Sequence, residues 1–257
     1  MELRRAYYSA VSYTDHNVGR VLSALEENGL DENTVVMFWG DHGWTLGEHS
    51  EFDKHTNWNI ATHAPVMFRV PGLTDKKKGV RTYQVTETVD IFPSLVDFAL
   101  QETIPSCASS EEETTTCTDG TSVRPLIENP DVALKSSALS AYDRGIPREE
   151  EEVEEEEKLK KSVPKMSNCL LGRGEGCAMG YSILTHFDGH EVRYTEWVHY
   201  PGPSHDFKPI WSTNYGTEFY NHTESPGENV NRFRWIENTT VHETLSKRLH
   251  DKVARCN

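Results

Sequence analysis

Long apolar runs are missing from this sequence, and so is any excess of positive charge. No stretch approaches the roughly 18 consecutive apolar residues that a membrane-spanning helix needs. The opening residues, Met-Glu-Leu-Arg-Arg-Ala-Tyr-Tyr, hold two arginines but no apolar region after them, so they do not form a signal peptide. The net charge of −15 argues against a nucleic-acid-binding role, for which a basic stripe is expected.

The composition is typical of a globular chain with one segment rich in acidic residues. Its 257 residues suffice for one domain or two small ones, each with a real core. Hydrophobic residues make up 36% and charged residues 26%, which is typical of a globular protein with some disordered content. Residues 148–161 hold eight glutamates against four basic residues, and the rest of the chain is still acidic. We interpret this run as a solvated insertion; calcium buffering or partner docking is the alternative.

Five cysteines and two glycosylation sequons indicate an oxidising, secretory context. The sequon acceptors are Asn221 and Asn238, and each sequon alone is a weak signal because the pattern is common. The missing signal peptide conflicts with a secretory context. We therefore expect that Met1 is not the natural start of the full protein.

The first hundred residues show an alternation of helix and strand patterns. Residues 2–28 have apolar side chains at helical spacing, and residues 34–39 form a β-branched and aromatic run typical of a buried strand. A second strand is predicted over residues 65–70 and a second amphipathic helix over 87–100. This order of elements predicts an α/β layer architecture, in which ligand sites lie at the carboxyl ends of strands.

The pattern weakens between residues 101 and 165, where we expect a loop-rich connection with an acidic low-complexity insertion. Order returns further on, because Asp188-Gly189 separates two strand-like runs and predicts a hairpin. The elements expected in this part are strands over 180–184, 192–198 and 217–220, and a helix over 241–254.

The chemistry-bearing segment is residues 38–54, whose core places Asp41 and His42 directly after the first strand. Adjacent residues point to opposite faces of a regular strand, so both can reach one ion only if the backbone turns. Gly40 and Gly43 flank the pair and permit such a turn. Aspartate offers a hard oxygen ligand, histidine an imidazole, and Lys54 a compact positive charge for an anionic oxygen. Together they suit a tetrahedral anion such as sulfate or phosphate.

A plainer interpretation of the same residues is an ordinary turn, because an isolated Asp-His pair is usually only that. The strand-end position, the flanking glycines and the nearby Gly-Glu-His raise the functional interpretation above this background. His49 is either a substrate contact or a loop histidine. Trp44 either lines a sugar site or packs the loop.

At this point the sequence resembles the sulfatase family. Asp-His-Gly-Trp-x-Leu-Gly-Glu-His followed by a lysine is similar to the second metal-binding segment of sulfatases, and the match is greatest with the iduronate-sulfatase branch. Further blocks fit in order: residues 11–25, 61–66, 89–96, 179–183, 193–198 and 217–222. The resemblance covers most of residues 5–100 and 177–235.

The resemblance implies a fold and a set of site residues. The fold is α/β, part of an alkaline-phosphatase-like sulfatase sandwich plus a small C-terminal antiparallel sheet subdomain with a terminal helix. The domains would be 1–100 (catalytic α/β part), 101–165 (connection) and 166–257 (C-terminal α+β subdomain). Asp41 and His42 match two ligand positions of one calcium ion, although calcium prefers oxygen to imidazole nitrogen. Lys54 matches a catalytic, sulfate-contacting lysine.

Other residues acquire expected roles from the same resemblance. Trp44 and His49 would line the substrate site with Lys54. Cys107 and Cys117 lie in the loop where iduronate sulfatases carry a disulfide, so we expect that bridge.

The sequence departs from the family in one large respect. Sulfatases attack sulfur with a formylglycine made from a Cys-x-Pro-x-Arg or Cys-x-Ala-x-Arg motif in their N-terminal half, where two aspartate ligands also lie. None of these is present, and Cys169-Leu-Leu-Gly-Arg173 has leucine at the Pro/Ala position and lies far from the family's location. A disulfide between Cys169 and Cys177 is the structural alternative for that cysteine.

The expected function is therefore that of a fragment. The parent enzyme would remove the 2-O-sulfate of iduronate in heparan and dermatan sulfate, in the lysosome or outside the cell, and this chain would be inactive alone. Its partners would be the sulfated glycosaminoglycan, or another sulfate ester, and the missing N-terminal half; no nucleic acid and no membrane span are expected. The rival interpretations are a phosphodiesterase-like member of the alkaline phosphatase superfamily and a non-catalytic, glycan-binding remnant.

Overall fold

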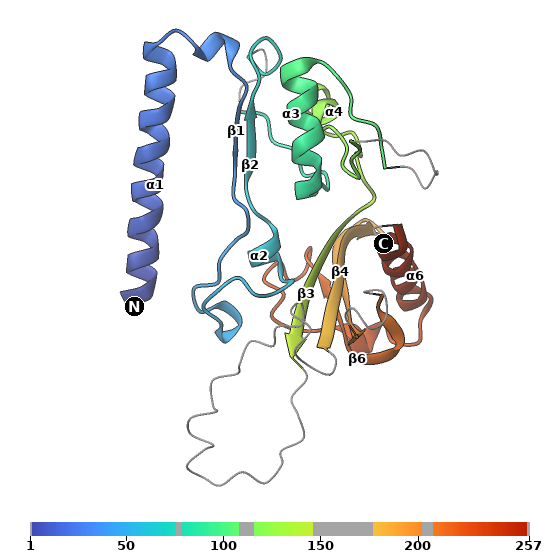
Figure 1. Ribbon diagram of the computed structural model, residues 1–257. Helices are drawn as coiled ribbons and strands as arrows, with labels where there is room; N and C mark the ends of the chain where they lie inside the picture. Colours follow the sequence, from blue (N-terminus) through green and yellow to red (C-terminus); the bar gives the residue numbers. More distant parts are fainter. Residues whose placement is uncertain (1, 76–78, 108–115, 146–176, 202–207, 256–257) are drawn as a thin grey trace. The chain divides into compact units, whose positions relative to one another are not determined.

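The structure of the protein is a computed structural model that describes residues 2–75, 79–107, 116–145, 177–201 and 208–255. It contains two compact units (Figure 1). The first comprises Met1–Lys54 and Ile60–Ser136, and the second His55–Asn59 and Ser137–Asn257. The glutamate run, Cys169 and Cys256 lie outside the described residues. Within the described ranges, no helix has the length and apolarity needed to cross a membrane.

The first unit contains the two helices and two strands that the sequence predicts there, but the first strand is not buried as predicted, because Phe38 and Trp39 are 38% and 46% exposed. Strands β1 and β2 pair antiparallel, with Phe38 opposite Met67 and Trp39 opposite Val66. The helices and strands of this unit are α1 (Glu2–Glu27), β1 (Val36–Trp39), α2 (Asn59–Thr62, whose first residue belongs to the second unit), β2 (Val66–Arg69), α3 (Ile91–Leu100) and α4 (Arg124–Glu128).

The core of the first unit lies around α3. Phe98 of α3 is buried with Val70, Val123 and Leu126, and its ring meets Phe68 of β2 edge-on at 5.4 Å between centroids. A polar cluster fixes the connection after α4, because the Lys135 ammonium lies 2.6 Å from a carboxylate oxygen of Glu87 and 2.6 Å from one of Asp90. The unit therefore combines a small apolar core with buried ion pairs.

Helix α1 contributes almost nothing to that core. Among the described residues, none of the 26 in α1 is buried. Apolar side chains of this helix that point to solvent include Tyr8, Val11, Tyr13, Val21 and Leu22, and Tyr13 and Val21 are each 69% exposed. Val11, Val21 and Leu22 share one side of the helix and form an apolar stripe, which normally packs against another element, so this stripe has more apolar surface than the described unit covers.

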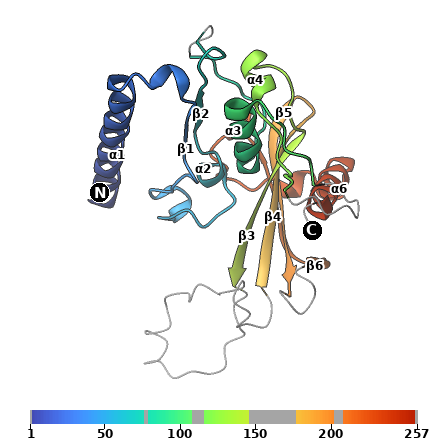
Figure 2. The ribbon, with the colours of Figure 1, turned by 45° about the horizontal axis from the view of Figure 1, so that its top comes forward.

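The second unit is a four-stranded antiparallel sheet in the order β3-β4-β5-β6, with a helix on one face (Figure 2). The predicted hairpin joins β4 and β5, and Asp188 (φ 50°) and Gly189 (φ 77°) form its two-residue turn. Left-handed conformation at both turn residues matches the twist of the flanking strands. The elements are β3 (Ser137–Gly145), β4 (Cys177–Phe187), β5 (His190–Tyr200), β6 (Ile210–Asn221) and α6 (Thr240–Arg255).

Helix α6 covers the apolar face of this sheet. Leu245, Leu249 and Val253 recur every four residues and are 0–4% exposed, in one cluster with Ile183 and Tyr194 of the central strands. A polar clamp supplements the packing: the Glu196 carboxylate accepts from Tyr194 Oη at 2.8 Å, and His250 Nε2 lies 3.0 Å from it. The predicted terminal helix is thus confirmed, and its apolar residues recur every four positions because they face the sheet.

Two features of the sheet differ from the sequence prediction. β3 occupies residues for which only a loop-rich connection is expected, and β6 begins seven residues before the predicted Thr217. β3 is held by its ladder to β4, with Ser140 opposite Ser182. The register between β5 and β6 shifts near Val198, which breaks the alternation of side chains along β6. The predicted fold class is nevertheless confirmed, including the small antiparallel sheet with a terminal helix.

Candidate functional site

The candidate site begins where β1 ends. Gly40 closes the ribbon through its N–H to Pro65 O at 3.0 Å, and the chain then leaves the strand at Asp41. The Asp41 side chain is 78% exposed, and its Oδ1 accepts from the backbone N–H of His42 at 3.0 Å. This turn brings the adjacent Asp41 and His42 side chains to the same side, as the sequence analysis requires.

The imidazole of His42 has a polar contact at each ring nitrogen. Its Nδ1 lies 2.8 Å from the carbonyl oxygen of Gly43. A carbonyl only accepts, so Nδ1 is the donor in this contact. Nε2 lies 3.4 Å from Asp41 Oδ2. A ring nitrogen and a carboxylate oxygen this close need a proton or a cation between them: a ring proton makes an ion pair, and a cation makes a two-residue metal ligand pair.

Gly43 is needed for a reason other than turn flexibility. Neither Gly40 nor Gly43 is among the glycines with positive φ. A Cβ on Gly43 would lie 1.9 Å from the carbonyl oxygen of Ile60, and the Gly43 N–H donates to Ala61 O at 2.8 Å. The loop is therefore pressed against the Ile60–Ala61 backbone, and only glycine allows that approach.

Thr45 and Asp53 close the loop that carries the remaining candidates. The Thr45 N–H donates to Asp53 O at 2.7 Å, and the Asp53 N–H donates to Thr45 Oγ1 at 2.8 Å. Thr45 is fully buried. Because residues 45 and 53 are paired, their outer neighbours Trp44 and Lys54 are brought together, although ten positions separate them in the chain.

Lys54 and Trp44 are in direct contact. The Lys54 ammonium lies 5.5 Å from the centroid of the Trp44 ring, within the range of a cation–π interaction. The Trp44 ring in turn stacks on Tyr7 of α1 at 6.0 Å and lies 6.2 Å from the His42 ring. Trp44 thus links the Asp41–His42 pair to Lys54, which supports a role in positioning the lysine rather than loop packing alone.

His49 occupies the tip of the same loop. It adopts a left-handed conformation (φ 55°), as does Ser50 (φ 62°), within a turn closed by Gly47 N–H to Glu51 O at 2.8 Å. Consecutive left-handed non-glycine residues cost roughly 1–3 kcal/mol each and concentrate at functional loops. The backbone N–H groups of Leu46 and Glu48 lower the pKa of the Glu48 carboxyl, so this carboxylate stays ionised.

The donor atoms fit part of a calcium site. Calcium takes six to eight ligands, preferably oxygens, and Asp41 Oδ2 and His42 Nε2 supply two donors. In the part of the chain that the structure describes, no group of three or more His, Cys, Asp or Glu side chains could hold a metal ion. The pair is therefore a partial site at most.

Asp41, His42, Trp44 and Lys54 remain predicted site residues, and the sequence prediction does not include the residues that hold them in place. Tyr7 lies far upstream, and nothing in its helical context indicates contact with Trp44. Thr45 and Asp53 form an ordinary pair of loop residues in sequence, and their role follows only from the backbone path.

The predicted modification sites are placed as follows. Cys107 and Cys117 form the expected disulfide, with 4.9 Å between their Cα atoms. Cys177 is also disulfide-bonded, and its proposed partner Cys169 lies outside the described residues. Asn238 is exposed just before α6, at φ 59°. Asn221 ends β6 half-buried, with its amide 3.4 Å from Glu224 Oε1.

Comparison with known proteins decides the family. The sulfatase profile matches residues 2–101. Human iduronate 2-sulfatase is 30% identical over 225 residues, which is 77% of this chain and 38% of that protein. The mouse iduronate 2-sulfatase is 30% identical over 247 residues, 85% of this chain and 42% of that protein. This chain belongs to the sulfatase family.

The sulfatase fold is also seen in solved structures. BT4656, solved in complex with its substrate D-glucosamine-2-N,6-O-disulfate, matches with a TM-score of 0.62 at 22% identity, over 94% of this chain and 38% of that one. This likeness shows the fold alone. The sulfatase chain described here spans about two fifths of the length of the curated relatives that it matches.

Proposed function

We propose that this chain supplies one side of the active site of a sulfuric ester hydrolase that removes the 2-O-sulfate of iduronate from heparan and dermatan sulfate. The observation that carries the proposal is the constellation Asp41, His42, Trp44 and Lys54 in a chain that belongs to the sulfatase family. The similarity to iduronate 2-sulfatase over most of the chain supports the choice of substrate.

Each residue has a defined task in this proposal. Asp41 Oδ2 and His42 Nε2 would hold a calcium ion, which polarises sulfate oxygens when bound. The Lys54 ammonium would bind an anionic oxygen of the sulfate group and stabilise charge that develops there. Trp44 holds the ammonium over its ring and so limits the positions that Lys54 can take.

The nucleophile and the remaining calcium ligands would come from residues outside this sequence. No Cys-x-Pro-x-Arg or Cys-x-Ala-x-Arg motif occurs in it. The solvent-exposed apolar stripe of α1 supports this part of the proposal, because it offers a surface on which further sulfatase residues could pack. The Cys107–Cys117 disulfide supports an oxidising compartment, lysosomal or extracellular.

The coding sequence upstream of Met1 provides the first test. A signal peptide, a pair of aspartates after a strand and a Cys-x-Pro-x-Arg motif are expected there. The longest translated product should then hydrolyse an iduronide 2-sulfate in the presence of calcium. Lys54→Ala should abolish turnover, whereas the matched surface variant Lys247→Ala, whose side chain is 75% exposed on α6, should retain it.

Two outcomes would favour the rival functions. Hydrolysis of phosphate diesters with a zinc requirement would indicate a phosphodiesterase of the same superfamily. Binding of sulfated oligosaccharide without turnover, in a product that contains the formylglycine motif, would indicate a glycan-binding remnant. Sulfatase turnover by the 257-residue chain alone would contradict the proposal that the active site is shared.

A further inference from the structure

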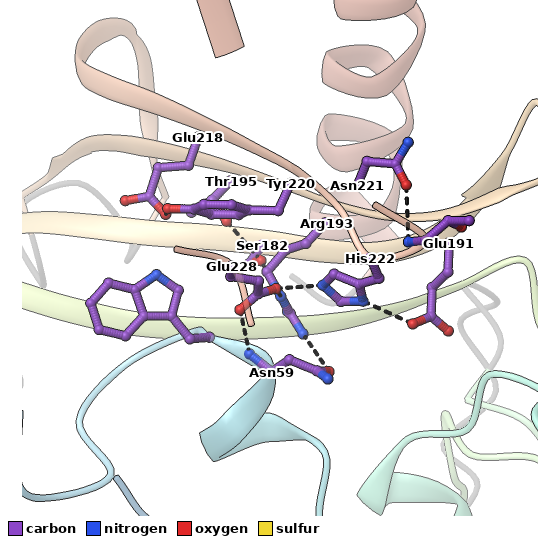
Figure 3. Close-up of polar contacts among 12 residues, drawn as sticks. Asn59, Ser182, Glu191, Arg193, Thr195, Glu218, Tyr220, Asn221, His222 and Glu228 are labelled. Atoms are coloured by element: carbon purple, nitrogen blue, oxygen red, sulfur yellow. Dashed lines mark hydrogen bonds and ion pairs between the residues drawn. The ribbon is translucent and has the colours of Figure 1, made fainter. Parts of the chain in front are cut away.

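A buried cluster of charges lies in the second unit, on the face of the sheet opposite α6 (Figure 3). β5 contributes Arg193 and Glu191, and the turn after β6 contributes His222 and Glu228. The side chains of Arg193, Glu228 and His222 are 3%, 1% and 5% exposed, whereas Glu191 lies at the edge of the cluster with 36% of its side chain exposed. Charged groups are rarely buried this deeply unless each has a partner, so the contacts within the cluster determine what it does.

Glu228 is the centre of the cluster. Its Oε1 accepts from Arg193 Nε at 2.7 Å and lies 2.6 Å from His222 Nε2. Its Oε2 accepts from the backbone N–H of Asn59 at 2.6 Å. The residue itself has a left-handed backbone (φ 52°), a conformation that a non-glycine residue adopts at some cost. The turn therefore holds Glu228, the residue that contacts all three donors, in a strained backbone conformation.

His222 must carry two protons in this geometry. Its Nε2 faces Glu228 Oε1 at 2.6 Å, and its Nδ1 faces Glu191 Oε1 at 2.8 Å (Figure 3). Both oxygens belong to carboxylates, which only accept hydrogen bonds when ionised. A neutral ring has one donor and one acceptor nitrogen, so one of the two contacts would set lone pair against lone pair. The imidazolium satisfies both contacts, and with Arg193 it balances the two carboxylates.

The cluster holds a segment that is distant in sequence. Besides the Asn59 N–H bond to Glu228, Asn59 Oδ1 accepts from Arg193 Nη2 at 3.5 Å. Asn57 is 3% exposed, and its side-chain amide donates to Gly180 O of β4 at 2.7 Å. These contacts attach His55–Asn59 to the four-stranded sheet within the second unit. His55 directly follows Lys54 in the chain.

We propose that His222 is a proton-operated latch, whose doubly protonated ring holds Glu228 where it pins the His55–Asn59 segment to the sheet, and that loss of the ring proton loosens this segment. The latch is closed in acid and weakened near neutral pH. It lies outside the Asp41–Lys54 loop, and it stands whether or not the proposed activity is correct.

The electrostatics agree with this direction. Burial alone would lower the pKa of His222, but the hydrogen bonds to Glu191 and Glu228 outweigh burial and raise the pKa above its ordinary 6.5. Burial would likewise raise the pKa of Glu228, but the bond from His222 and the charge of Arg193 outweigh burial and lower it. The Arg193 charge opposes protonation of His222. Burial, and to a lesser extent the charge of Glu228, raise the pKa of Glu218 on β6. Asn59 contributes no charge.

The sign of the pH dependence follows from the raised pKa of His222. The latch contributes its full stability below the ordinary pKa of about 6.5. The contribution is lost as the pH rises from there through the folded-state pKa. Within that window the equilibrium constant for release of the segment should rise about tenfold per pH unit, since one proton is lost.

Hydrogen exchange and histidine NMR on the 257-residue chain test the latch directly. The protection factor of the Asn59 amide, corrected for intrinsic exchange, should fall about tenfold per pH unit above pH 6.5 or so. Amides at the centre of the β4–β5 ladder, such as Tyr194, should show a weaker dependence. The nitrogen shifts of His222 should report a doubly protonated ring at pH 6.5, and both ring protons should exchange slowly.

Substitution separates the latch from general pH effects. His222→Gln keeps one donor and cannot be protonated, so the protection of Asn59 should become independent of pH over the same window. His16→Gln removes an exposed histidine of α1 and should leave the pH dependence unchanged. A neutral His222 ring at pH 6 with a protonated Glu191, or an Asn59 protection factor that is flat from pH 5 to pH 8 in the unsubstituted chain, would overturn the inference. The measurements on the unsubstituted chain decide the question even if the variant does not fold.

Discussion

The clearest single test of the second unit's architecture is Glu228→Gln. The glutamine keeps the shape of the side chain but removes the charge that Arg193 and His222 both face. With its amide oxygen at the Oε1 position, its NH₂ group opposes the Asn59 N–H, which donates at 2.6 Å to Oε2 in the structure. In the flipped orientation the NH₂ group opposes Arg193 Nε. Either way a buried donor meets a donor.

The expected cost follows from burial. Arg193 and Glu228 are 3% and 1% exposed, so solvent does little to screen their charges. Removing one partner of such a buried ion pair costs about 3–5 kcal/mol, because the other charge is left without compensation. The matched control is Glu224→Gln in the same turn. The Glu224 side chain is 51% exposed and pairs with Arg232, so its loss should cost about 0–1 kcal/mol.

The assay must report on the second unit alone, since two compact units need not unfold together. Native-state hydrogen exchange of Ile183 and Tyr194, both fully buried in the central strands, provides this readout in increasing urea at pH 5. A 3 kcal/mol loss lowers the protection factor by more than a hundredfold. If Glu228→Gln and Glu224→Gln differ by less than about 1 kcal/mol, the cluster is not a determinant of stability and the reasoning fails.

Three further predictions concern other parts of the chain. Gly43→Ala should disorder the candidate loop, because the new Cβ would lie 1.9 Å from the Ile60 carbonyl oxygen. Limited proteolysis of this variant should cut between residues 40 and 54. The control variant Gly216→Ala, whose new Cβ meets no atom within 4 Å, should resist cleavage. Leu249→Ala should destabilise the second unit by about 2–5 kcal/mol in urea denaturation, because the side chain is fully buried. If Leu249→Ala and the exposed control Lys247→Ala lose the same free energy of unfolding, α6 does not pack as described. Amides of α1 should exchange at least about a hundredfold faster than those around Leu249, because no described residue of α1 is buried; equal protection would mean that α1 is covered in solution.

The sequence predicts those elements whose signal lies within a few neighbouring residues. The α6 helix follows from Leu245, Leu249 and Val253 at spacing four, and the β4–β5 hairpin follows from Asp188-Gly189, which can both adopt positive φ. β3 has no such signal. Its sequence, Ser-Ala-Leu-Ser-Ala-Tyr-Asp-Arg-Gly, has few of the residues that favour strands, and its pairing partner β4 lies more than 30 residues away. Pairing at that distance is decided by tertiary contacts rather than by propensity.

The two polar sites differ in the same way. Asp41, His42 and Lys54 are contained in one contiguous motif, so the sequence alone is enough to predict them as site residues. The latch draws Asn59, Arg193, His222 and Glu228 from positions up to 169 residues apart. Composition also misleads there, because Arg and Glu are expected on the surface, and only the structure shows that these two are almost fully buried.

The two long helices differ in how much of their apolar surface is covered. Both carry apolar residues at helical spacing, but α6 buries its stripe at 0–4% exposure, whereas Tyr13 and Val21 of α1 are each 69% exposed. Helices in proteins owe most of their stability to packing of such a stripe rather than to propensity. The human relative extends well beyond the 38% of its length that this chain matches. The uncovered stripe belongs to the same unit as Asp41, His42 and Lys54, and α1 contacts their loop through Tyr7 and Trp44. Under the proposed function, residues outside this sequence that packed on α1 would lie in the same unit as the Asp41–Lys54 loop.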